Sequence, residues 1–309
     1  MPRPPLPDAP PAGEASSDGF EVCDAANARG GPLPARLAAL RRIAGLAGTP
    51  GCTVRVSSDA ERDRLVPHWT SGADDVDRAL GPGGLAVDSL HEVKPALAEM
   101  GGCHAGDWAA ALAFGLRLAL RRMLHAAQMG EGSALLWCQP RHAASELGRL
   151  HAPGLKHLGI DPARVIVVET ARREETLWAM EEGLASGALA LVAGIVDDVG
   201  LTPARRLSLR AERYRTPCLL LTSPHAATTA ATATRWRIAR HPGARHPFDP
   251  RAPGALRLAV ALERCRQHPP LPAAVSFSLE WSDEAFRFDM ASGLADRADG
   301  PRERRRFAA

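Results

Sequence analysis

The chain has 309 residues, more than one small domain needs and too few for two large ones at about 100–200 residues each. Hydrophobic residues make up 45% of it, which is enough for one sizeable core with tails. The formal net charge of +3 is well short of the strong basic excess that is typical of a dedicated DNA-coating protein. Lysine occurs only at Lys94 and Lys156, so nearly every cation is arginine, which indicates a GC-rich coding bias rather than nucleic-acid binding.

The cysteines and the N-terminus indicate the compartment. The six cysteines are scattered without a CxxC pair, a pattern typical of reduced thiols in a cytosolic protein. The N-terminal residues have no apolar h-region of a signal peptide, and no apolar run reaches the roughly 18 residues that span a bilayer. We therefore expect a soluble, cytoplasmic protein without membrane contact.

The first part of the chain predicts little regular structure. Residues 1–34 are rich in Pro, Gly, Ala and Ser and have almost no apolar periodicity, so we expect a disordered tail. Residues 35–66 predict a short amphipathic helix, with Leu37, Leu40 and Ile43 on its apolar face, followed by a polar connector.

A repeated alternation of strands and helices follows, and we expect one core over 67–290. The pattern predicts strands over 89–93, 134–138, 164–170, 188–198 and 218–223, and helices over 76–80, 107–127, 143–157, 176–187 and 202–215. The last helix has Thr202 as its expected N-cap and Pro203 at its first position. Because the strands read as nearly continuous apolar runs, the fold class is α/β, a doubly wound and mostly parallel sheet flanked by helices.

The pattern changes after the last of these strands. Polar and apolar residues alternate strictly over 234–241, 256–266, 276–281 and 285–290. We expect these segments, within 234–290, to be antiparallel strands that extend one edge of the sheet. The tail over 291–309 is basic and is expected to be disordered.

The loop after the first core strand is where a doubly wound sheet binds its ligand. A working phosphate-binding loop reads GxxxxGK[ST], in which the Lys reaches the terminal phosphates and the hydroxyl holds magnesium. Here Gly101, Gly102 and Gly106 are present, but Asp107 replaces the Lys and Trp108 replaces the Ser/Thr. At about 4 Å and an effective dielectric near 20, a carboxylate and a phosphate charge repel by roughly 4 kcal/mol. We therefore expect a vestigial site without nucleotide, partly plugged by Trp108.

Residues 70–290 resemble the core of RecA/RadA-type ATPases. The resemblance lies in SGADDVDRALGPGGLAVDSLHEV, before the loop, and in LGIDPARVIVVETARREETLWAMEEGLASGALALVAGIVDDVGLTP, through the next two strands. More narrowly, the chain resembles the ImuA family of RecA-like accessory proteins, through GGLAVDSLHEV, the LWC strand, LHAPGL, IDPARVIVVE, LWAMEEGLASGALALV and LTPARRLSLRAE. The resemblance covers about 70% of the chain and depends on the order and spacing of these stretches.

The RecA-type pattern implies further losses. A catalytic acid is expected after the second strand, where 138–141 holds no carboxylate. An aspartate is expected at the end of a later strand, near 195–196, and Asp197 and Asp198 come one or two residues late. The resemblance thus implies a pseudo-ATPase that is not an enzyme and holds no cofactor or metal.

The resemblance also implies a function and partners. It implies a non-catalytic adaptor in SOS-induced, error-prone translesion DNA synthesis. The implied partners are an ImuB-type polymerase-like protein, an alternative replicative-type DNA polymerase and RecA, with DNA contact weak or indirect. The surface used would be the helix at Leu37, Leu40 and Ile43, or the edge after residue 234 and the tail beyond 290.

Other residue clusters have both a functional and a structural interpretation. Asp197 and Asp198 could hold magnesium or could simply end a strand. Cys103 with His104, or Cys138 with His142 and His151, could suggest zinc, but neither set has the paired spacing of a structural zinc site. Several arginines could contact phosphates or could form solvated faces. The candidates for partner or DNA contact are Arg206, Arg210 and Arg213 on a helix and Arg304, Arg305 and Arg306 in the tail; Arg235, Arg237 and Arg240 alternate along a strand.

Three alternatives stay open. An atypical ATP-binding protein would use Lys94 or an arginine in a rearranged site. A cell-division inhibitor of the SulA type has a RecA fold but a shorter chain. A plain DNA-binding module would bind with an affinity that falls steeply with salt.

Overall fold

The computed structural model describes residues 22–24, 67–97, 102–244, 246, 248–249, 251–252, 254–266 and 274–291. The helix expected around Leu37, Leu40 and Ile43 lies outside these residues, as do Gly101 and the tail arginines Arg304, Arg305 and Arg306. Within the described part, no helix is long and apolar enough to cross a membrane.

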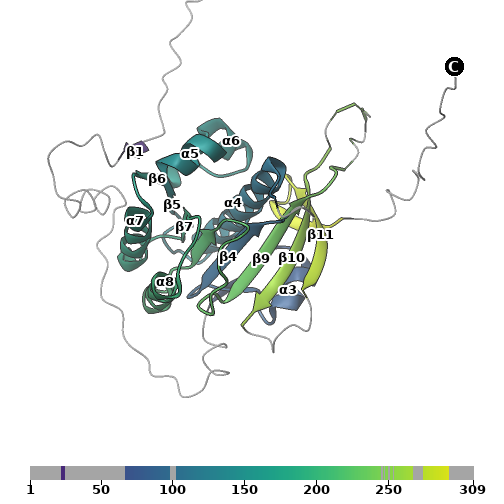
Figure 1. The fold of residues 1–309 in the computed structure, drawn as a ribbon. Coiled ribbons are helices and arrows are strands. Elements are labelled where there is room, and N and C mark those ends of the chain that lie inside the picture. Colours follow the sequence, from purple (N-terminus) through teal and green to yellow (C-terminus); the bar gives the residue numbers. More distant parts are fainter. Residues whose placement is uncertain are drawn as a thin grey trace, which may run out of the picture.

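A ten-stranded sheet forms the centre of the protein (Figure 1). Its order is β1-β6-β5-β7-β8-β4-β9-β10-β11-β12. The strands are β1 (Val22–Asp24), β4 (Leu90–Pro95), β5 (Leu135–Pro140), β6 (Val165–Thr170), β7 (Leu191–Ile195), β8 (Cys218–Leu221), β9 (Thr234–Arg240), β10 (Arg257–Cys265), β11 (Val275–Ser282) and β12 (Arg287–Met290). The pairs from β1 to β9 are parallel, and those from β9 to β12 are antiparallel. The predicted α/β class, a mostly parallel sheet with an antiparallel extension, is confirmed.

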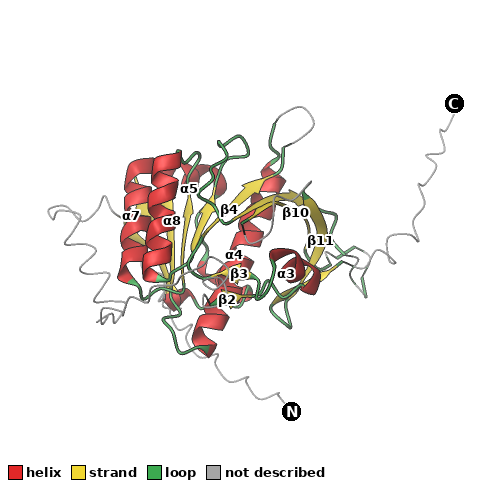
Figure 2. Cartoon of the chain, turned by 90° about the horizontal axis from the view of Figure 1, so that it is seen from below, coloured by secondary structure: helices red, strands yellow, loops and turns green. Residues whose placement is uncertain are grey.

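Helices cover both faces of the parallel part (Figure 2). They are α3 (Asp74–Leu80), α4 (Ala105–Gln128), α5 (Arg141–Leu147), α6 (Ala152–His157), α7 (Arg173–Ser186) and α8 (Leu201–Tyr214), with a 3₁₀ turn at Pro162–Arg164. A separate two-stranded sheet joins β2 (His68–Trp69) and β3 (Leu85–Ala86). Helix α7 ends where Gly187 adopts φ 64°, the left-handed conformation that glycine reaches without strain.

Alternating side chains of the strands build one apolar core on each face. Odd-numbered residues of β7 and β8, such as Leu191 and Leu219, pack in the larger cluster with Phe114 and Leu118 of α4. Their neighbours Val192 and Leu220 pack in the second cluster with residues of α7 and α8. The period of two in the strands thus accounts for strands that are apolar on both faces.

Strand β9 corrects one expectation. The alternation over 234–241 was expected to give an antiparallel strand, but β9 pairs in parallel with β4, His91 opposite Thr234, and is antiparallel only to β10. Alternation reports one polar face of a strand, and it does not report the direction of the neighbouring strand. The antiparallel part of the sheet therefore begins at β10.

Two helices and one strand also differ from expectation. The single helix expected over 143–157 is two helices, α5 and α6, because Gly148 with φ 91° ends the first. Helix α8 begins at Leu201 with Gly200 as its N-cap, so Thr202 lies in its first turn and is not the cap. Strand β1 lies within 1–34, where no ordered element is expected, and its backbone pairs with β6.

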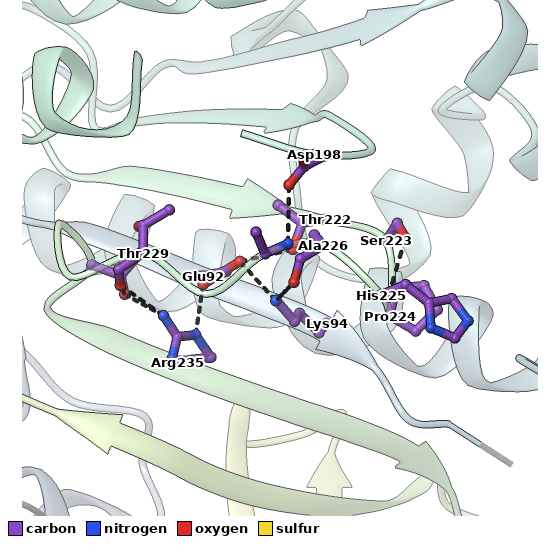
Figure 3. A network of polar contacts seen from close by, with 12 residues as sticks. Glu92, Lys94, Asp198, Thr222, Ser223, Pro224, His225, Ala226, Thr229 and Arg235 are labelled. Atoms are coloured by element: carbon purple, nitrogen blue, oxygen red, sulfur yellow. Dashed lines mark hydrogen bonds and ion pairs between the residues drawn. The ribbon is translucent and has the colours of Figure 1, made fainter. Parts of the chain in front are cut away.

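The connection from β8 to β9 is the last element of the fold that contributes to the candidate functional site. Unlike the connections that carry α7 and α8, residues 222–233 contain no helix or strand. We call residues 222–233 the crossover segment. It lies over the part of β4 and β9 that faces the α8 side, and polar side chains fill the space beneath it (Figure 3).

Candidate functional site

Asp107 lies in the first turn of α4, next to the end of β9. Its side chain is 5% exposed, and Oδ1 accepts a hydrogen bond of 2.9 Å from the backbone N–H of Arg240. The position in the first helical turn also suits a carboxylate, because the helix dipole is positive there. Asp107, at the position where a phosphate-binding loop is expected to carry its Lys, thus connects α4 to β9.

The neighbouring residues are packed closely around this connection. A Cβ at Gly106 would lie 3.1 Å from Cδ of Arg240, so the helix start approaches that arginine closely. Trp108 is half-buried, and its backbone N–H donates to the carbonyl of His104. Gly102 is exposed, and among the described residues beyond its chain neighbours no atom lies within 4 Å of the place of a Cβ.

The paired carboxylates after β7 have separate partners. Asp197 Oδ2 lies 3.0 Å from Nε2 of His142, both side chains being about half exposed or more. Asp198 Oδ1 accepts a hydrogen bond of 3.0 Å from the backbone N–H of Ala227 in the crossover segment. Neither carboxylate is therefore directed at a shared ion. In the described part of the chain, no group of three or more His, Cys, Asp or Glu side chains could hold a metal.

A buried cluster of charges lies beneath the crossover segment (Figure 3). Glu92 and Lys94 of β4 and Arg235 of β9 are at most 9% exposed in their side chains. Glu92 Oε2 accepts from Arg235 Nε at 2.8 Å, and its Oε1 accepts from the Thr222 hydroxyl at 2.9 Å and lies 3.4 Å from Lys94 Nζ. Burying these charges costs free energy, and the contacts of Glu92 with two cations and a hydroxyl help to offset that desolvation.

The two cations also hold the crossover segment directly. Lys94 Nζ donates to the carbonyl of Ala226 at 2.6 Å, and Arg235 donates to the carbonyl of Thr229 at 2.8 Å. Burial lowers the pKa of Lys94, while Glu92 opposes that shift. Lys94 is thus enclosed and bonded within the protein, which disfavours the alternative in which it reaches a nucleotide.

The charge cluster was missed by the sequence analysis, although a signal existed. Glu92 and Lys94 stand two residues apart within a strand whose residues are all buried, so they share one face of that strand. Charged residues are almost never fully buried without partners, so such a pair predicts further charged residues on the strands beside it.

The predicted basic face of α8 is mostly engaged with α7. Glu181, which is buried on α7, contacts Arg206 at 2.5 Å and Arg210 at 3.6 Å. The guanidinium of Arg213 lies over the ring of Tyr214, 5.5 Å from its centroid and so within the about 6 Å of a cation–π contact. The spacing correctly placed these arginines on one helix, but two of them serve the packing of α7 against α8.

The strand arginines have three different environments. Arg235 belongs to the buried cluster, Arg237 forms an ion pair with Glu263 of β10, and Arg240 is exposed beside the start of α4. The alternation along β9 therefore places Arg235 and Arg237 on one charged face, which carboxylates of the adjacent strands partly neutralise.

Comparison with curated proteins finds relatives of this chain. It is 30% identical over 210 residues to Protein ImuA of two Caulobacter vibrioides strains. Each match covers 65% of this chain and 79% of the relative. No family model matches the chain. The identity and coverage show that the chain belongs to the ImuA family.

Proposed function

We propose that this protein is a non-catalytic, RecA-like adaptor in damage-induced, error-prone translesion DNA synthesis. Membership of the ImuA family supports a role in the ImuA/ImuB damage-induced mutagenesis system. In this proposal the protein recruits or stabilises a complex of an ImuB-type polymerase-like protein with an alternative replicative-type DNA polymerase, and it also contacts RecA.

The hydrogen bond from the Arg240 backbone to Asp107 carries the non-catalytic part of the proposal. A nucleotide phosphate at the start of α4 would meet this carboxylate instead of a lysine. Two further groups at the same end of the sheet have partners within the protein, since Lys94 bonds to Ala226 and Asp198 bonds to Ala227. These contacts support a core whose shape is stable without ATP.

A core that does not cycle ATP can still present fixed surfaces to partners. Assembly with such partners would then be independent of nucleotide. This separates an adaptor from an atypical ATPase, in which nucleotide would change the affinity for a partner by coupling the two sites.

Assembly tests the proposal. The full chain is immobilised and its capture of a purified ImuB-type protein is measured with ATP, with ADP, and after enzymatic removal of nucleotide. We expect equal capture in all three. Capture that requires ATP would contradict the non-catalytic role, and no capture in any condition would contradict the adaptor role.

A cellular assay tests the pathway itself. Deletion of the gene should lower the frequency of mutations induced by DNA damage, and the wild-type gene should restore it. An unchanged mutation frequency in the deletion strain would contradict the assignment to translesion synthesis.

A further inference from the structure

A β-bulge places two arginines opposite each other on adjacent strands. The register between β9 and β10 shifts between Leu262 and Arg264, and beyond the shift Arg264 pairs with Arg235. An extra residue in one strand redirects the side chains around it. Like charges directly opposite each other destabilise a sheet, and bulges recur near functional sites.

The carboxylates of this region bond to other cations. Glu92 bonds to Arg235, and Glu263 bonds to Arg237. Among the described residues, Arg264 donates only to the carbonyl of Ala230, at 3.3 Å, and its buried Nε has no hydrogen-bond partner. The positive charge of Arg264 is therefore not neutralised by any described carboxylate.

A third arginine and an unpartnered hydroxyl lie in the same region. Arg266 follows at the end of β10, its side chain is exposed, and its charge acts on Arg264. Thr229 is 8% exposed, and within the described residues its Oγ1 has no hydrogen-bond partner. Arg235 joins these groups, because it donates to the Thr229 carbonyl and opposes Arg264.

The electrostatics of Arg264 agree with an excess of positive charge in this region. Burial lowers its pKa, and the charges of Arg235 and Arg266 lower it further. An anion beside Arg264 and Arg266 would relieve this repulsion. A guanidinium fork matches the oxygens of a phosphate group, to which it can donate two parallel hydrogen bonds.

We propose that Arg264 and Arg266, backed by Arg235, form a binding site for a phosphate group at the start of β9 and the end of β10. The phosphate could belong to the backbone of a single nucleic-acid strand or to free phosphate, since both present the same oxygens. This site is separate from the start of α4 and from the basic face of α8.

Salt-dependent binding of a fluorescein-labelled single-stranded oligonucleotide tests the site. Fluorescence anisotropy is measured over a series of KCl concentrations for the full-length protein and for the Arg264→Ala/Arg266→Ala variant. We expect the variant to bind about tenfold more weakly in low salt. The slope of log affinity against log salt should fall by about 1.4, because each contact to a single-strand phosphate contributes about 0.7.

The matched control is the variant Arg172→Ala/Arg205→Ala. It removes the same charge from two exposed arginines near α7 and α8 and retains the C-terminal tail. We expect it to bind like the wild type. Equal losses in the two variants would show a general charge effect and would overturn the proposed site.

Inorganic phosphate separates the two sources of the ligand. If phosphate raises the melting temperature of the wild type but not of the Arg264→Ala/Arg266→Ala variant, and the oligonucleotide does not bind, the site takes free phosphate. If neither ligand distinguishes the wild type from that variant, the proposal is wrong.

Discussion

Removing either charge of the Glu92–Lys94 pair should destabilise the protein, but by different amounts. Glu92→Gln leaves two buried cations without a carboxylate, since Lys94 and Arg235 share this one partner. Breaking a buried ion pair from one side costs about 3–5 kcal/mol. Lys94→Met removes the donor to the Ala226 carbonyl, but Glu92 keeps its bonds to Arg235 and Thr222. The loss is then close to that of one buried hydrogen bond, about 1–3 kcal/mol.

Urea unfolding followed by tryptophan fluorescence measures this difference. Trp137 and Trp236 are fully buried in the core, so their emission reports global unfolding. The double variant Glu92→Gln/Lys94→Met should lose less stability than the sum of the single changes, because it leaves one unpaired cation instead of two. A Lys94→Met variant that is as unstable as Glu92→Gln would refute the sharing of Glu92 between two cations.

Three further changes test other contacts. Stability should fall by about 3 kcal/mol between pH 6.5 and 4, because burial lowers the pKa of His91 from 6.5 to about 4 and the unfolded chain takes up the proton first. In urea unfolding, His91→Gln should show a weaker fall over this range; an equal fall would exclude His91 as its source. Asp107→Ala removes the acceptor for the Arg240 N–H and should lower the free energy of unfolding by about 1–3 kcal/mol in the same assay, whereas an unchanged value would show that the bond contributes nothing. Arg206→Ala, at an exposed guanidinium, should cost less than about 1 kcal/mol in thermal unfolding, and a larger loss would mean that its pair with Glu181 is far stronger than its exposure allows.

The positions of strands and helices were predictable from the sequence wherever a single local pattern determines them. Strands β5 and β6 begin as apolar runs that fill both faces, and Gly187 marks the end of α7, so the positions of these elements follow from residue type. The direction of β9 was not predictable in this way. Its alternation predicts one polar face. That face is accommodated in the sheet because carboxylates of other strands, Glu92 and Glu263, pair with its arginines.

The candidate site shows the same limit. The sequence predicts that Asp107 reverses a charge of the phosphate-binding loop, but its acceptor role depends on Arg240, which lies 133 residues away. Likewise, the helical spacing places Arg206 and Arg210 on one face, but it does not predict their contact with Glu181 on the neighbouring helix. Contacts over such separations depend on how the elements pack, which a local pattern does not encode.

A nucleotide titration tests most directly the claim that this core does not bind ATP. The purified full-length protein is titrated with a fluorescent ATP analogue and magnesium, alone and with RecA filaments. No saturable binding is expected up to millimolar nucleotide, because in our proposal Asp107 stands where a working loop has its phosphate-binding Lys, and Asp107 accepts a hydrogen bond from the Arg240 backbone. Saturable binding that plain ATP displaces would contradict the proposal, and a nucleotide site would then have to exist elsewhere in the protein.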